Sequence, residues 1–184
     1  YSFMGLAASC AYLIDTLLAE SPQRGVALVG HGMGGMLALE VAVRRPDLVR
    51  QLVLVATAPA VLPGDGYDRH IAQGLRWLDE AQAMQTTADT LLPRLVSPGA
   101  LPEGVRLATF CQSQVHAATW HHALQAMRGF DRRAALGHVA APTLVVAGEH
   151  DRVAPPETLS AMAHAITGAQ LLTLPGAGHL PHLE

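Results

Sequence analysis

Apolar positions along the chain follow two spacings, one typical of helices and the other typical of buried strands. In residues 2–20 they recur every three or four positions, which predicts an amphipathic helix. Residues 25–29 and 52–56 are short, continuous apolar runs of the kind that a parallel sheet buries on both faces. Residues 34–45 return to helical spacing and end before Pro46. The order strand, helix, strand predicts a βαβ unit, and therefore an α/β fold with a mostly parallel sheet.

The pattern changes at residue 59 and changes back near residue 141. Between these positions no strand-like run occurs, and the spacing predicts helices over residues 69–83, 87–95 and 105–127. Strand-like runs resume at residues 143–147 and 170–174, with a helix over 156–166 between them. We therefore expect a core formed by residues 1–58 and 142–184, and a helical insertion formed by residues 59–141.

The turn between the first strand and the following helix has an unusual sequence. Residues 30–35 read Gly-His-Gly-Met-Gly-Gly. The pattern G-x-S-x-G at such a turn holds a nucleophilic serine above the sheet, and small flanking residues let strand and helix approach closely. Here Gly30 and Gly34 are the small residues, and Gly32 stands where the serine would be. The sequence thus predicts a nucleophile elbow without its nucleophile.

Two later loops carry residues that would complete a catalytic site. Asp151 follows the strand predicted at 143–147, and His179 follows the strand predicted at 170–174. Both loops lie beyond the carboxyl ends of parallel strands, where open α/β sheets bind their ligands. We expect Asp151 to accept a hydrogen bond from one ring nitrogen of His179, which leaves the other nitrogen to act as a base.

These three motifs, in this order, resemble those of the α/β-hydrolase-fold superfamily, and in particular bacterial esterases, enol-lactonases and C–C ring-cleavage hydrolases. The resemblance implies an α/β-hydrolase fold in which residues 59–141 form a helical cap over the pocket. It also implies that Asp151 is the acid, His179 the base, and the Met33 amide one donor of the oxyanion hole.

The chain departs from this family in two ways. Gly32 replaces the nucleophile, either by natural change or by design. The family's first strands, and the loop that gives the second oxyanion donor, have no counterpart before the elbow strand, and the family's last helix has none at the other end. We therefore expect the chain to be a fragment that lacks the N-terminal strands.

Several residues are candidates for lining the pocket. We expect Met33, Trp120, Met127 and Val153 to contact the substrate, in a pocket that is mainly apolar. Trp120 and Met127 lie on one helical stripe with His116 and Ala123, so the stripe either packs the cap or forms the ceiling of the pocket. His31 is expected to support the core. His116, His121 and His122 are not expected to bind a metal, because adjacent histidines diverge on a helix and no carboxylate joins them.

Composition narrows the partners. The 184 residues are 50% hydrophobic with a net charge of -3, which suggests neither nucleic acid nor an anionic membrane as a partner. All 12 basic residues are arginine, and lysine and asparagine are absent, as in GC-rich bacterial genomes. The two cysteines show no disulfide or metal pattern, so we expect a cytoplasmic protein. No signal peptide or membrane span is visible, and no cofactor is expected. A small-molecule substrate is the expected partner, and a homodimer is left open.

The motifs admit three functions. The first is a hydrolase of a small ester, lactone or C–C bond whose nucleophile position holds Gly32. The second is a lyase, cyclase or oxygenase that uses the His179–Asp151 pair as a general base, or a site in which that pair activates water beside Gly32. The third is a non-catalytic protein that keeps the pocket to bind a ligand. Restoring serine at position 32 distinguishes them.

Overall fold

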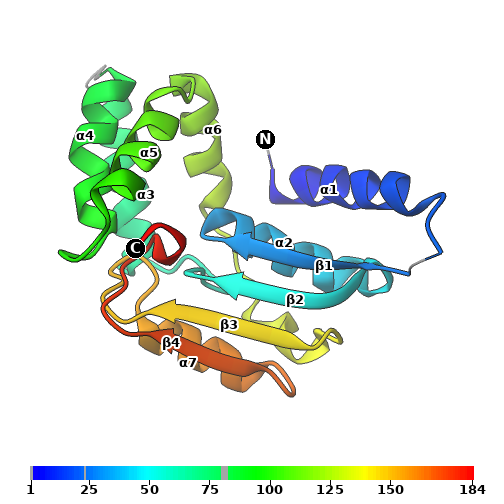
Figure 1. Cartoon of the computed structure of the whole chain (residues 1–184). Coiled ribbons are helices and arrows are strands. Elements are labelled where there is room, and N and C mark those ends of the chain that lie inside the picture. Colours follow the sequence, from blue (N-terminus) through cyan, green and yellow to red (C-terminus); the bar gives the residue numbers. More distant parts are fainter. Residues whose placement is uncertain (1, 23, 80–82) are drawn as a thin grey trace.

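The computed structural model describes residues 2–22, 24–79 and 83–184, and at its centre lies a parallel sheet in the order β1-β2-β3-β4 (Figure 1). The strands are β1 (Val26–His31), β2 (Val49–Val55), β3 (Thr143–Gly148) and β4 (Gln170–Leu174). The register pairs Gly30 with Leu54 and Val55 with Val146. Because every pairing is parallel, the carboxyl ends of the strands lie at one edge of the sheet.

Helices cover one face of this sheet. They are α1 (Phe3–Leu18), α2 (Met33–Arg44) and α7 (Pro156–Ala165). α2 packs against β1 and β2, α7 packs against β3 and β4 on the same face, and α1 packs on α2 (Figure 1). The side chains that fill this layer include Met36, Leu39, Leu52, Leu54, Val145 and Leu159. The predicted βαβ unit is therefore confirmed.

The prediction that the first strand is buried on both faces is wrong. β1 is an edge strand of the described sheet, and Val29 is 65% exposed. Leu172 of β4, on the same face as Val29, is 45% exposed. The physical reason is that α2 and α7 both lie on the opposite face, so no helix of the described residues covers these side chains.

Four helices lie between β2 and β3, beyond the carboxyl ends of the strands (Figure 1). They are α3 (Gly66–Asp79), α4 (Met84–Leu95), α5 (Pro102–Ser113) and α6 (Ala117–Met127), and we call them the cap helices. In residues 59–79 and 83–141 the structure has no strand of the sheet, only an isolated antiparallel bridge between Ala60 and Asp131. Of the helix predicted at 69–83, residues 80–82 lie outside the described residues.

The single helix predicted over residues 105–127 is in fact two. α5 begins earlier, at Pro102, and ends at Ser113, and α6 begins after His116. The ring of His116 accepts a hydrogen bond from the Ala118 amide at 3.3 Å, so it satisfies one of the amides that a new helix leaves unpaired. Apolar spacing continues across this break, which is why periodicity alone missed it.

Short 3₁₀ helices at Pro46–Leu48, Arg133–His138 and Pro181–Leu183 complete the connections. Among the helices of the described residues, none is both long enough and apolar enough to cross a lipid bilayer.

Candidate active site

The turn at Gly32 has the backbone conformation that the elbow motif predicts. β1 ends at His31, α2 begins at Met33, and Gly32 between them has φ 54° and ψ -123°. Its amide donates to Val55 O at 3.0 Å, and its carbonyl accepts from Thr57 Oγ1 at 2.7 Å. A Cβ at Gly30 would collide with the backbone of Gly34, so only glycine there allows α2 to start so close to β1.

Asp151 and His179 are brought together at the same edge of the sheet. His179 Nδ1 lies 2.8 Å from Asp151 Oδ2, and both residues are buried. The carboxylate is acceptor-only when ionised, so Nδ1–H donates to it and Nε2 is left as an acceptor. A Cβ built on Gly32 would lie 3.6 Å from His179 Nε2. The imidazole therefore connects the acid to the position of residue 32.

The second oxygen of Asp151 fixes the carboxylate in place. Oδ1 accepts hydrogen bonds from the Val153 amide at 2.8 Å and from the Ala154 amide at 2.9 Å. Val153 itself is buried and is not part of the lining of the cavity at Gly32, where we expected it. Because Val153 comes two residues after Asp151, its backbone amide holds the carboxylate, and its side chain packs in the core.

The ring of His31 contacts the backbone and the ring of His179. Its Nε2–H donates to the carbonyl oxygen of His179 across 2.6 Å, and its ring lies 5.1 Å from the His179 ring. Burial, and then repulsion from His179, lower the pKa of His31 to about 4, so it is neutral at pH 7. The expected supporting role of His31 agrees with this geometry.

Tyr67 is a neighbour of the site that the sequence did not reveal. Its hydroxyl donates to Ala56 O at 2.8 Å and lies 3.6 Å from the Cβ position of residue 32. Burial, and then the Asp151 carboxylate, raise the pKa of this hydroxyl well above its usual value, so it remains protonated. No motif spacing marks Tyr67, because it comes from the start of α3 in the cap.

A cavity of about 310 Å³ lies over these groups. Gly32, Met33 and His179 form its floor, and the cap helices supply most of its wall, including the predicted Trp120 and Met127. The Met33 amide is in the first turn of α2, where backbone N–H groups have no partner within the helix, and such amides bind developing negative charge. Two polar cap residues that no sequence motif marks, His70 and Gln112, also line this cavity.

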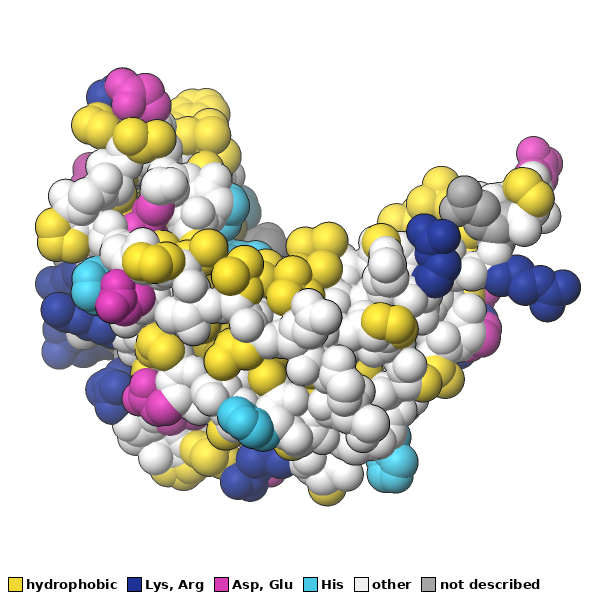
Figure 2. Space-filling view, turned by 60° about the horizontal axis from the view of Figure 1, so that its bottom comes forward, with side chains coloured by type: hydrophobic (Ala, Val, Ile, Leu, Met, Phe, Trp, Pro, Cys, Tyr) yellow, Lys and Arg dark blue, Asp and Glu magenta, His cyan; other side chains and the backbone are white. Residues whose placement is uncertain are grey.

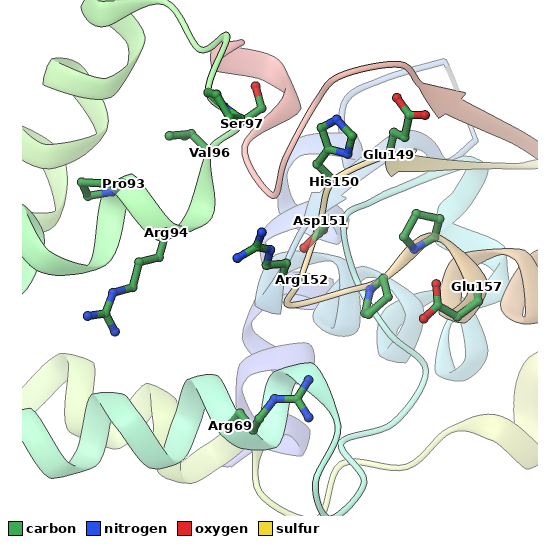
Figure 3. Close-up of a pocket in the computed structure, with 13 residues that line it drawn as sticks. Arg69, Pro93, Arg94, Val96, Ser97, Glu149, His150, Asp151, Arg152 and Glu157 are labelled. Atoms are coloured by element: carbon green, nitrogen blue, oxygen red, sulfur yellow. The ribbon is translucent and has the colours of Figure 1, made fainter.

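A larger groove of about 1030 Å³ lies on the outer side of the Asp151 loop (Figure 3). Arg69 from α3, Arg94 from α4 and Arg152 from the loop after β3 surround it. Neither Gly32 nor His179 contributes to it. The smaller cavity is therefore the one in which chemistry at the Asp151–His179 pair would take place.

Metal chemistry has no candidate ligands in the part of the chain that the structure describes, because no three His, Cys, Asp or Glu side chains group together there. His121 and His122 lie side by side on α6, with their ring centres 5.8 Å apart.

The fold matches a known family. A family model described as the alpha/beta hydrolase fold matches residues 1–184. The chain belongs to the α/β-hydrolase fold family. Gly32, Asp151 and His179 follow β1, β3 and β4, which is the chain order that the resemblance implied.

Individual relatives are hydrolases. A pimeloyl-[acyl-carrier protein] methyl ester esterase of Nitrosospira multiformis is 30% identical over 170 residues, which cover 85% of this chain and 62% of that protein. A hydrolase from Pseudomonas aeruginosa PA01 superposes with a TM-score of 0.82 at 28% identity, covering 97% of this chain and 66% of that one. A thermophilic esterase from Thermogutta terrifontis gives 0.84 at 25% identity, covering 100% and 67%. The chain thus spans less than two thirds of the length of the curated esterase.

Proposed function

We propose that this chain carries the acid–base half of an esterase-type site that hydrolyses a small ester or lactone. The observation that carries the proposal is the orientation of His179. Nδ1 is bound to Asp151, and Nε2 lies 3.6 Å from the Cβ position of residue 32. The similarity to esterases supports hydrolysis over the other chemistries of this fold.

The mechanism that fits Gly32 uses water in place of serine. A water beside Gly32 gives a proton to His179 Nε2 while its oxygen attacks the carbonyl carbon of the ester. The Met33 amide donates to the resulting oxyanion, and Asp151 stabilises the imidazolium. The tetrahedral intermediate then breaks its bond to the alkoxide, which takes the proton from His179. The products are a carboxylic acid and an alcohol.

This route is slow. Loss of the nucleophile from a serine hydrolase costs on the order of 10⁶ in kcat, and on the order of 10³–10⁴ over water remains from the oxyanion hole and binding. We propose that the same pocket, covered by the cap helices, acts on a small molecule. We also propose that the protein is cytoplasmic, because the thiols of Cys10 and Cys111 are free and the cytoplasm keeps thiols reduced.

The deciding experiment is Gly32→Ser. The nearest atoms to a Cβ at this position are 3.6 Å away, so the side chain fits, and its hydroxyl would lie beside His179 Nε2. We expect hydrolysis of a short-chain 4-nitrophenyl ester to rise by about 10³-fold or more. Gly32→Ala is the matched control, since it imposes the same backbone strain without an oxygen. Adding His179→Ala to the serine variant should abolish the gain.

Other outcomes would assign other functions. If Gly32→Ser folds but gains nothing, and the glycine form exchanges an acidic C–H proton of a substrate with solvent, the pair is a general base for carbon-acid chemistry. If neither form turns over an ester, a lactone or a carbon acid but the cavity binds such a ligand, the protein is a binding protein. Either result would contradict the hydrolase proposal.

A further inference from the structure

Two polar side chains in the wall of the cavity at Gly32 form no hydrogen bond within the described residues. His70 comes from α3 and Gln112 from α5, and both line the cavity that contains Gly32 and His179. The amide nitrogen of Gln112 is buried without a hydrogen bond. For His70, no hydrogen bond to any part of the described chain is found. Buried polar atoms in folded proteins are nearly always paired, so the unpaired Gln112 amide nitrogen points to a ligand group that pairs with it, and the half-buried His70 ring lines the same cavity.

We propose that His70 and Gln112 together hold an uncharged oxygen-bearing group of the substrate, a hydroxyl or a carbonyl, separate from the ester that reacts. The Gln112 amide nitrogen donates to that oxygen. The neutral His70 imidazole has one N–H donor and one acceptor nitrogen, so it can donate to a carbonyl or hydroxyl oxygen or accept from a hydroxyl group. This assignment rests on the proposed function and adds the substrate class to it.

The charge of the cavity favours an uncharged group over a carboxylate. Burial, and then repulsion from His179, lower the pKa of His70 to about 4, so its ring is neutral at pH 7. No arginine is among the described residues that line the cavity, whereas Arg69, Arg94 and Arg152 all face the outer groove (Figure 3). An anionic group inside would therefore meet the Asp151 carboxylate nearby without a compensating cation.

The rest of the wall is apolar and sets the size of the substrate. The apolar lining residues include Leu91, Leu95, Trp120, Leu124 and Met127. A cavity of about 310 Å³ with this wall accepts a short alkyl chain, with His179 at the floor and His70 and Gln112 in the wall. The substrate class is thus a short ester with one hydroxyl or oxo group along its acyl chain.

The experiment compares matched esters on the protein with Gly32. The probes are ethyl pentanoate, ethyl 4-oxopentanoate and ethyl 3-hydroxypentanoate, and their Kd values are measured by calorimetry. We expect at least one oxygenated ester to bind about tenfold more tightly than ethyl pentanoate, the gain from one well-formed hydrogen bond in a buried site. Gln112→Leu and His70→Phe should each remove most of this preference, measured as the ratio of the Kd values of the oxygenated ester and ethyl pentanoate. Gln114→Leu, at an exposed position just beyond the same helix, is the control and should keep the preference.

A second measurement separates a ligand-binding role from a structural one. Without ligand, Gln112→Leu should leave the Tm unchanged or raise it, because it removes a buried amide that has no partner. A lower Tm would show that Gln112 serves the fold, and equal Kd values for the three esters would overturn the proposal. If ethyl pentanoate binds and the Gly32→Ser variant hydrolyses it without any preference, only this inference fails. If no ester binds and that variant is inert, the esterase proposal itself fails.

Discussion

His31 shows how a single half-buried side chain makes the stability of the protein depend on pH. The unfolded chain has an ordinary histidine pKa near 6.5, whereas in the folded protein burial and then repulsion from His179 lower the pKa to about 4. Below about pH 6.5 the unfolded chain therefore binds a proton that the folded chain does not, so the free energy of unfolding falls as the pH drops toward about 4.

We predict that His31→Gln makes this pH dependence shallower. Glutamine keeps an N–H donor for the His179 carbonyl but removes the proton uptake, and the remaining slope comes in part from His70, whose pKa is lowered in the same way. Urea unfolding at pH 7, 6 and 5 measures the slope. His138→Gln, at an exposed position, is the control and should leave the slope unchanged. Equal slopes in His31→Gln and the parent protein would contradict the prediction.

Among single residues, the sequence predicts the candidates that lie in recognisable motifs and misses those that only the folded structure brings to the site. Gly32, Asp151 and His179 each follow a strand, so a parallel sheet places them at one edge and the loop order identifies them. Tyr67, His70 and Gln112 come from cap helices, whose approach to the site depends on packing between elements far apart in the chain. No local spacing records that packing. The catalytic and binding roles of both groups of residues stay predictions, which the variants described above test.

Among the secondary-structure elements, a buried ion pair joins α2 to the segment that returns from the cap. The side chain of Glu40 is fully buried, and Arg132 Nη2 donates to Glu40 Oε1 at 3.0 Å, with a further contact from Arg44. Burial alone would raise the pKa of Glu40, but hydrogen bonds from Arg132 and Arg44 lower it. The carboxylate is therefore ionised in the folded protein, and its stabilising effect is lost as the pH falls through that lowered pKa.

We predict that Arg132→Met destabilises the protein by about 3 kcal/mol, because it leaves a buried carboxylate with only part of its compensation. Arg133→Met is the matched control. Arg133 pairs with Asp131 at the surface, where water screens the charges, so its loss should have little effect. Chemical unfolding at pH 7 measures both. A similar loss in the two variants would mean that the Glu40 pair does not stabilise the junction.

Boundaries of the elements show where periodicity stops being informative. The strand predicted at 170–174 and the helix predicted at 156–166 agree with β4 and α7 to within a residue, because Pro156 and the apolar runs mark their starts. The predicted helix over 105–127 failed because the break between α5 and α6 depends on a His116 ring that accepts from the backbone. Histidine is not a usual N-cap residue, so the sequence does not predict that a new helix begins after His116.

For the whole molecule, the two faces of the sheet differ in what covers them. Parallel sheets are almost always covered on both faces. Here α2 and α7 bury the face that carries Leu54 and Val145, while Val29 and Leu172 on the other face are exposed to solvent. In Figure 2, hydrophobic side chains gather across the middle of the surface between the cap helices and the end of α1. The sequence could predict apolar strands but not which face the described helices would leave uncovered, since that depends on where the connections run.

The same substitution on the two faces measures this difference. We predict that Val145→Thr costs about 1–3 kcal/mol, because it places a hydroxyl where the side chain is fully buried. Val29→Thr, at a position that is 65% exposed, should change the free energy of unfolding by no more than about 0.5 kcal/mol. Urea unfolding at several protein concentrations is the measurement. If Val29→Thr costs as much as Val145→Thr, the open face is covered in solution. A cost that grows with protein concentration would then identify the cover as a second copy of the chain, the homodimer that the sequence left open.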